Sequence, residues 1–278
     1  MATHGFLASD MLTSFVITAF VNAKNAARCR VYFNAKPRGK MPSLLNSRLI
    51  LERMDLPVSQ VIYEPRGSDT RLRKPRFLYF DLGNVLLYFD HMQACRQIAA
   101  LAEIDPQQVW DLVFDSGMEL RFEAGEVSTD EFYDHFCRQT KTRPEFAALT
   151  HAASSIFRVN GGMKAVLGQL LAARHRLGLL SNTNEIHWRH VADGRYSLLP
   201  EAFEVLVLSY EVKAVKPDPK IFRIAAEMAG VAPEDIFYTD DVPGHVAAAR
   251  TAGFDAVQYT TTPALVNELR ARGVEFNY

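Results

Sequence analysis

The sequence predicts an α/β fold, in which a doubly wound parallel sheet carries a helical segment inserted after its first strand. Four short runs are almost wholly apolar, which is typical of parallel strands that helices cover on both faces. Stretches of helical length separate these runs, as expected where strands and helices alternate. Residues 81–176 separate the first two runs, whereas a simple crossover unit needs only about 30 residues. We therefore expect a Rossmann-like core with a separate helical insertion.

The core elements follow from this alternation. The predicted strands are Phe77–Phe80, Leu177–Leu180, Val205–Leu208, Ile236–Tyr238 and a weaker Ala256–Tyr259. The predicted core helices are Gly162–Arg174, Pro219–Ala229 and Gly244–Ala252.

The insertion has a helical pattern of its own. Its predicted helices are Met92–Glu103, Gln107–Phe114, Thr129–Arg138 and Glu145–Phe157. Asp105 and Ser128 stand where helix starts are expected, because short polar side chains cap the first turn. We therefore predict a helical cap at 92–159, and a core made of 76–91 and 160–278.

The start of the chain differs in charge from the rest. Of the 31 Lys and Arg and the 32 Asp and Glu, 13 and 5 lie in residues 1–76, which leaves 18 and 27 in residues 77–278. The first part therefore carries +8 and the second −9. A basic, acid-poor start is compatible with a transit peptide, with a loosely ordered extension, or with translated sequence upstream of the true start. We predict a poorly ordered basic extension at 1–75, ending in a linker at Pro65–Lys74.

The composition indicates which classes of binding partner to expect. A net charge of −1 indicates neither a nucleic-acid nor a membrane partner, and the apolar stretch Met11–Val21 is too short to span a bilayer. Cys29, Cys95 and Cys137 are far apart and form no CxxC pair, so we expect reduced thiols in a cytoplasmic protein. We expect a monomer or homodimer.

Polar side chains follow the predicted strands at the sheet edge where open α/β folds bind ligands. The residues at this edge are Asp81, Ser181, Asn182, Lys216, Asp240 and Asp241. A carboxylate can attack phosphorus and hold the group as an acyl phosphate. Carboxylates from two strands can hold Mg²⁺, while a lysine and a hydroxyl group bind phosphoryl oxygens. The set therefore indicates phosphoryl transfer from a small phosphorylated metabolite.

Four segments, FDLGNVL, LLSNTN, KPDPKIF and YTDDVPGHVAAAR, resemble the ordered motifs of the haloacid dehalogenase-like (HAD) superfamily. The resemblance spans about residues 77–259, and the cap segment FEAGEVSTDEF is also similar to cap sequences there. Within the superfamily, the chain is most similar to the alpha-D-glucose-1-phosphate phosphatase-like group, whose first motif also reads DLGNV. This resemblance implies a Mg²⁺-dependent phosphatase that hydrolyses small phosphate monoesters, with sugar phosphates favoured, through an aspartyl-phosphate intermediate.

The resemblance also implies roles for single residues. Asp81 matches the nucleophile and a metal ligand, the carbonyl of Gly83 a second ligand, and Asp241 the metal-binding acid. Asp240 is expected to support the metal directly or through water.

Further residues match the groups that bind the phosphoryl oxygens. Ser181 and Lys216 are expected to be catalytic and to bind the substrate. Asn182 is expected to contribute to substrate binding.

Two positions depart from the family pattern. Gly83 stands where most phosphatases of the superfamily carry the aspartate that acts as general acid, a contribution typically worth about 10²–10⁴-fold. His245 stands where similar sequences carry Asn or Asp, and it is the first candidate for a replacement proton donor. Arg121 and Glu123 of the cap are expected on a solvated helix face rather than toward the substrate.

Three other functions compete with this hypothesis. A haloacid dehalogenase would not need the acidic pair Asp240 and Asp241, and a phosphoglucomutase would keep the acid that Gly83 lacks. A non-catalytic phosphate-binding or regulatory module stays open, because a fold and its motifs do not guarantee activity.

Overall fold

The computed structural model describes residues 18–21, 29–32 and 73–278. The chain divides into two units, residues 1–68 and 69–278, and each is described by itself. In the first unit, strands β1 (Thr18–Val21) and β2 (Cys29–Tyr32) pair antiparallel. The rest of the predicted extension up to residue 72 lies outside the described residues.

The core of the second unit is a five-stranded parallel sheet, with strand order β7-β6-β3-β8-β9. The strands are β3 (Phe77–Phe80), β6 (Leu177–Ser181), β7 (Val205–Leu208), β8 (Ile236–Asp240) and β9 (Asp255–Gln258). The chain thus fills one side of β3 and then the other, which confirms the predicted doubly wound, Rossmann-like fold.

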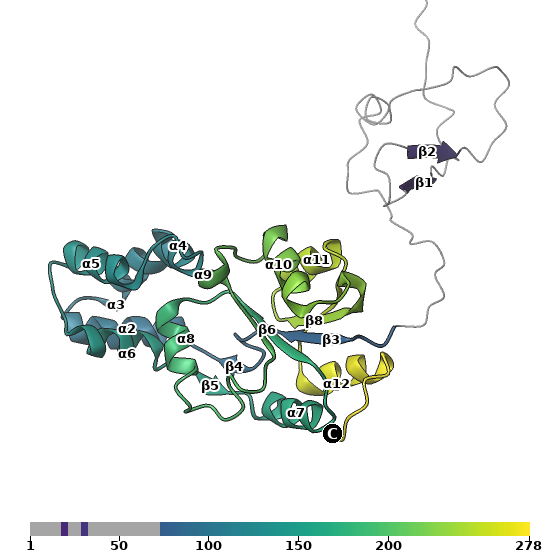
Figure 1. Cartoon of the computed structure of the whole chain (residues 1–278). Helices are drawn as coiled ribbons and strands as arrows, with labels where there is room; N and C mark the ends of the chain where they lie inside the picture. The colour runs from purple at the N-terminus through teal and green to yellow at the C-terminus, as the bar shows by residue number, and fades with distance from the viewer. Residues whose placement is uncertain (1–17, 22–28, 33–72) are drawn as a thin grey trace, which may run out of the picture. The chain divides into compact units, whose positions relative to one another are not determined.

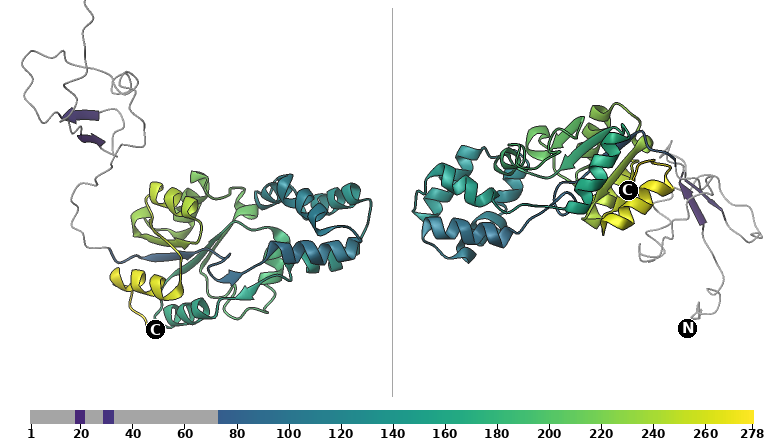
Figure 2. Two further views of the ribbon diagram at one scale, coloured as in Figure 1. Left: turned by 180° about the vertical axis from the view of Figure 1, so that it is seen from behind. Right: turned by 90° about the horizontal axis from the view of Figure 1, so that it is seen from below.

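Helices cover both faces of this sheet, as the apolar runs predicted (Figures 1 and 2). Side chains alternate between the faces, so Phe77 and Tyr79 join one buried cluster, and Leu78 and Phe80 join another. Helices α10 (Pro219–Ala229) and α11 (Pro243–Thr251) pack in the first cluster. Helices α7 (Gly161–Ala172) and α12 (Thr262–Ala271) pack in the second.

The insertion leaves and rejoins the core through a short antiparallel pair, β4 (Leu87–Tyr88) and β5 (Arg158–Val159). Its elements are α2 (His91–Ala102), α3 (Pro106–Trp110), the π-helical turn η2 (Asp111–Asp115), α4 (Met118–Glu123), α5 (Thr129–Thr140) and α6 (Phe146–Ser154). Most of these helices share a hydrophobic cluster separate from those of the sheet. This separate cluster supports our proposal that the cap predicted at 92–159 is a domain of its own.

Three short elements connect the core: α8 (Glu185–Val191), α9 (Ser209–Val212) and the 3₁₀ turn η3 (Pro233–Asp235). Helix α4 was missed by the sequence analysis. It begins after Gly117, which is left-handed (φ 75°) and offers no side-chain cap, so the usual start signal is absent. Among the described helices, none is both long and apolar enough to cross a membrane.

We predict that a shortened chain beginning at Arg71 folds with an unchanged melting temperature. Arg76 opens the core by donating its backbone N–H to the Asp235 carbonyl at 2.8 Å, and the shortened chain keeps this contact. It also keeps the Arg73–Asp235 ion pair (3.5 Å), which is exposed and worth little. Thermal unfolding of both chains tests this. A fall of more than a few degrees would show that the deleted residues pack on the core.

Candidate active site

Asp81 follows β3 directly, at the carboxyl edge of the sheet. Its backbone N–H donates to the Thr239 carbonyl of β8 at 3.0 Å, so the parallel pairing of β3 and β8 holds the residue in place. Its side chain is buried. The sheet therefore delivers one carboxylate to the point where Asp240 ends the neighbouring strand.

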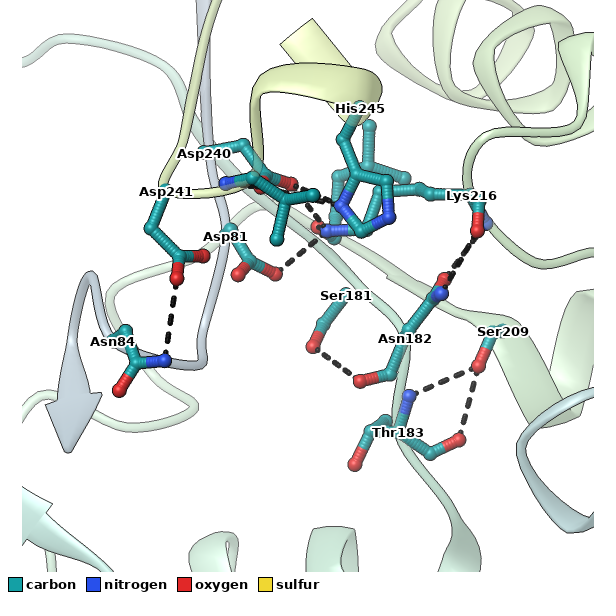
Figure 3. A network of polar contacts seen from close by, with 12 residues as sticks. Asp81, Asn84, Ser181, Asn182, Thr183, Ser209, Lys216, Asp240, Asp241 and His245 are labelled. Atoms are coloured by element: carbon teal, nitrogen blue, oxygen red, sulfur yellow. Dashed lines mark hydrogen bonds and ion pairs between the residues drawn. The ribbon is translucent and has the colours of Figure 1, made fainter. Parts of the chain in front are cut away.

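Lys216 reaches this point from the loop before α10, and its side chain is 1% exposed. Its Nζ donates to Asp81 Oδ1 and to Asp240 Oδ2, both at 2.7 Å (Figure 3). It also contacts the Tyr238 hydroxyl (3.0 Å) and the Leu180 carbonyl (3.1 Å). The ammonium group thus sits between the two carboxylates and engages one oxygen of Asp81, which leaves the other available.

Three predicted site residues, Asp81, Asp240 and Asp241, form an acidic cluster. Each offers a carboxylate oxygen, and these oxygens lie within 4.8 Å of one another. Asn84 Nδ2 donates to Asp241 Oδ2 at 3.2 Å and orients that carboxylate. Asn84 has a left-handed backbone (φ 51°), which Asn adopts more readily than most residues.

The charges of this cluster are unbalanced, because Lys216 faces more than one carboxylate. Burial raises the pKa of Asp81 to about 7, and the charges of Asp240 and Asp241 act in the same direction while Lys216 opposes them. Burial alone would lower the pKa of Lys216, but Asp81 and Asp240 outweigh it and raise that pKa. The site therefore favours an ionised lysine and has an excess of negative charge.

Asp240 and Asp241 have different surroundings. Asp240 is fully buried and accepts hydrogen bonds from Lys216, from the Tyr238 hydroxyl, from the Val242 N–H (2.8 Å) and, at 3.1 Å, from His245 Nδ1. Burial opposes its ionisation, yet Lys216 and these hydrogen bonds hold the pKa of Asp240 well below its usual range. Asp241 is only half-buried. Asp240 is therefore already satisfied by protein groups, whereas Asp241 is accessible.

The second motif lies beside Lys216. Ser181 ends β6, is buried, and its Oγ donates to the Asn182 carbonyl at 3.1 Å. The Asn182 amide binds the Lys216 backbone twice, accepting from its N–H (2.7 Å) and donating to its carbonyl (3.0 Å). Asn182 thus positions the lysine loop, a contact that the sequence analysis did not foresee. The following helix is capped by Asn184, which accepts from the His187 N–H at 3.0 Å, so neither Ser181 nor Asn182 serves as its cap.

Gly83 lies in the turn after Asp81. Its carbonyl accepts the Val85 N–H at 2.7 Å, which leaves a second lone pair for a ligand. A Cβ on Gly83 would stand 2.8 Å from Cε1 of Phe89. The aromatic ring of Phe89 therefore fills the space in which an aspartate side chain would begin.

Two further residues of the site were missed or misjudged. Tyr238 was read only as part of an apolar strand, yet its hydroxyl contacts both Lys216 and Asp240. Glu123 was expected on a solvated face, but it is half-buried, and the charges of Lys216 and Asp81 act on it. For Tyr238, the only signal in the sequence was its place near the end of a strand that two aspartates follow. For Glu123, the only signal was its place two residues before Gly125.

The fold and the site together define an α/β enzyme that presents a buried lysine and three aspartates beneath an inserted cap. The chain belongs to the haloacid dehalogenase-like hydrolase family, which it matches over residues 77–253. It is therefore a hydrolase, as the motifs predicted.

Several curated proteins are similar in sequence. A D-ribitol-5-phosphate phosphatase from Bacteroides thetaiotaomicron is 26% identical over 190 residues, which are 65% of this chain and 90% of that protein. A phosphorylated carbohydrates phosphatase from Thermotoga maritima is 30% identical over a region that covers 37% of this chain and 47% of that protein. Mouse acyl-CoA dehydrogenase family member 10 is 27% identical over 56% of this chain. The matched region covers only 15% of the length of that mouse protein.

Solved structures agree with this family. A HAD family enzyme from Bacteroides thetaiotaomicron, in complex with magnesium and inorganic phosphate, has a TM-score of 0.60 and 27% identity, covering 67% of this chain and 94% of that one. A HAD-like family hydrolase from Porphyromonas gingivalis has a TM-score of 0.63 and 25% identity, covering 71% and 98%.

We predict that Lys216→Met destabilises the protein by about 3–5 kcal/mol at neutral pH, because it leaves two buried carboxylates without their partner. The loss should shrink as the pH is lowered, since protonation removes the unpaired charge. Urea unfolding measures both effects. Lys220→Met, which removes an exposed lysine in the first turn of α10, is the matched control. Equal stability of the two variants would contradict the prediction.

We predict that Gly83→Asp costs about 1–3 kcal/mol, because the new Cβ overlaps the Phe89 ring. Phe89→Ala also costs stability, since the ring packs on His91 and Phe157 with centroids 4.7 and 6.2 Å away. In the double variant the overlap disappears, so the two costs should sum to more than the measured loss. Urea unfolding of the four proteins tests this, and simple additivity would refute it.

Proposed function

We propose that this chain is a Mg²⁺-dependent phosphatase that hydrolyses small phosphate monoesters, sugar phosphates above all, through an aspartyl-phosphate intermediate. The observation that carries the proposal is the buried Lys216 held between Asp81 and Asp240, with Asp241 beside them. This arrangement places a carboxylate nucleophile next to a fixed positive charge. The phosphatases among the relatives support the same reaction class.

The residues present suit a magnesium ion. Mg²⁺ binds through one or two carboxylates together with waters and substrate phosphate oxygens. Oxygens from Asp81 and Asp241, with the carbonyl of Gly83, would hold it, and the three clustered carboxylates outnumber the one lysine between them. Asp240, already bound by four protein groups, would act from behind and orient Lys216. When bound, the ion offsets the repulsion between the carboxylates and a phosphate dianion.

The reaction would proceed in two steps at Asp81. An oxygen of its carboxylate attacks phosphorus as the alcohol leaves, and water then hydrolyses the acyl phosphate. Lys216 binds a phosphoryl oxygen and stays protonated because two carboxylates flank it. Ser181 is expected to donate to the same phosphoryl group. Asn182 holds the lysine loop and is expected to bind substrate as well.

The rival functions fit the site less well. A haloacid dehalogenase would have no use for three clustered carboxylates, which repel a carboxylate substrate unless a cation is present. A non-catalytic module would have no need of a carboxylate with one free oxygen beside a buried lysine. We therefore favour hydrolysis of a small phosphorylated metabolite in the cytoplasm, by a monomer or homodimer and without nucleic acid or membrane.

We predict that the purified chain hydrolyses members of a broad panel of phosphate esters, that excess chelator stops turnover and that added Mg²⁺ restores it. Asp81→Asn should abolish turnover with little change in melting temperature, because the amide is nearly isosteric. Phosphate release is measured, with Asp134→Asn, an exposed change in the cap, as the control.

Two results would refute this function. Wild-type turnover by Asp81→Asn would exclude the nucleophile. Full activity in excess chelator would instead favour a metal-free mechanism like that of the dehalogenases.

A further inference from the structure

The cap rests on the core at the edge of the sheet that carries the site. Helix α6 packs on α8, and α4 packs on α9, which directly follows β7 (Figure 1). The cap has a hydrophobic cluster of its own and joins the core through the short pair β4 and β5. The cap is therefore a separate unit on a narrow connection, the arrangement from which hinge motions arise.

The residues that would receive a phosphate group are hardly exposed. The side chain of Asp81 is 9% exposed and that of Lys216 is 1% exposed. A phosphate monoester has to contact both, so part of the molecule must move before it enters and again before phosphate leaves. Because the cap lies over this edge of the sheet, a contact that holds it on the core would control that movement.

One such contact joins the turn after α4 to the end of α9. Lys213 Nζ donates to the Gly125 carbonyl at 2.6 Å. Gly125 is left-handed (φ 65°), and a Cβ on it would stand 2.2 Å from the Tyr210 carbonyl. Glycine permits this close approach. A hydrogen bond and a fitted glycine thus hold the cap on the core at this point.

The backbone at Lys213 does not itself favour a lysine. Lys213 ends α9 in the left-handed conformation (φ 53°), where glycine is favoured and a Cβ is penalised. The residue is exposed, so the position requires no apolar packing either. What the long side chain adds at this position is the hydrogen bond to the cap.

The core side of this contact is firmly held and leads to the site. Lys220 Nζ donates to the Lys213 carbonyl at 2.8 Å. Further along the same loop, the Asn182 amide binds the backbone of Lys216 at 2.7 and 3.0 Å. Lys213 therefore fastens the cap to the loop that carries the buried ammonium group of the site.

We infer that Lys213, bound to the Gly125 carbonyl, is a latch that holds the cap closed over the site and sets how fast phosphate enters and leaves. The latch itself follows from these contacts, whereas its effect on phosphate rests on the proposed phosphatase function. A single hydrogen bond at the surface suits this task, because its net strength is modest and the cap has to reopen.

The first test measures the distance between cap and core in the full chain. Spin labels are attached to Asp134→Cys in the cap and Glu227→Cys in the core, both exposed positions, with Cys29 replaced by serine. In Lys213→Gly we expect the population at longer distance to rise about 3–10-fold, since one hydrogen bond is lost. The melting temperature should equal or exceed that of the wild type, because glycine suits the left-handed position. A lower melting temperature with an unchanged distance distribution would show a merely structural lysine and overturn the latch.

Two matched controls separate the latch from backbone effects. Lys141→Gly changes an exposed lysine that ends α5 in the same conformation (φ 57°), and it should leave the distances unchanged. Gly125→Ala should open the cap as Lys213→Gly does, because the new Cβ meets a backbone carbonyl. Gly117→Ala carries the same left-handed strain (φ 75°) with no atom within 4 Å, and it should not. An equal shift in either control would overturn the inference.

The second test uses inorganic phosphate with Mg²⁺ as the probe, followed by the ³¹P line width. In Lys213→Gly the exchange rate of bound phosphate should rise about 3–10-fold while the dissociation constant stays nearly unchanged, because the lost hydrogen bond is to the cap and not to the site. A changed dissociation constant with an unchanged rate would show that Lys213 acts on binding and not as a latch. If the wild type binds no phosphate with Mg²⁺, the proposed function fails, and the distance measurement still decides the latch.

Discussion

Lys216 brings a positive charge into the interior of the core, and it can do so only because Asp81 and Asp240 lie 2.7 Å away on either side. A buried ammonium without such partners costs several kcal/mol. The two carboxylates come from neighbouring strands, so the pairing of β3 with β8 is what makes the burial possible. In turn, the lysine loop must be held at the carboxyl edge, and the Asn182 amide does this through the backbone of Lys216. Sheet order, loop position and site charge therefore depend on one another.

The same interaction explains why the site calls for a further cation. One ammonium group cannot neutralise three carboxylates. Burial raises the pKa of Asp81 to about 7, and the charges of Asp240 and Asp241 act in the same direction against Lys216. A carboxyl group attacks phosphorus only in its ionised form. Additional positive charge near Asp81 and Asp241 would lower that pKa and restore the attacking form. The accessible Asp241, oriented by Asn84, is the acid best placed to share such a charge, because Asp240 already accepts four protein hydrogen bonds.

The sequence allowed the sheet and its edge to be predicted, because a strand buried on both faces leaves an unmistakable apolar run that ends in polar residues. The family motifs then brought Asp81, Ser181, Lys216 and the two aspartates of β8 and its loop to one place, as the structure does. The contacts missed were those that depend on tertiary packing. Helix α4 starts after a left-handed glycine with no cap residue, and its glutamates look like a solvated face until the cap lies on the core. Tyr238 looks apolar in an apolar strand, and only the folded position of Lys216 gives its hydroxyl a partner.

The contact between the core and the cap depends on the turn after α4 and on the ring of Phe89. The core holds Asp81, Lys216 and Asp241, but Gly83 leaves it without an acidic side chain two residues after Asp81. Helix α4 docks on the core through Gly125, which lies so close to α9 and the loop after it that a Cβ has no room there. The Phe89 ring packs in the space beside Gly83. The same ring stacks on His91 at the start of α2, the first helix of the insertion. The missing side chain at Gly83 therefore has two consequences, because it removes an acid near Asp81 and admits an aromatic contact that joins the core to the cap.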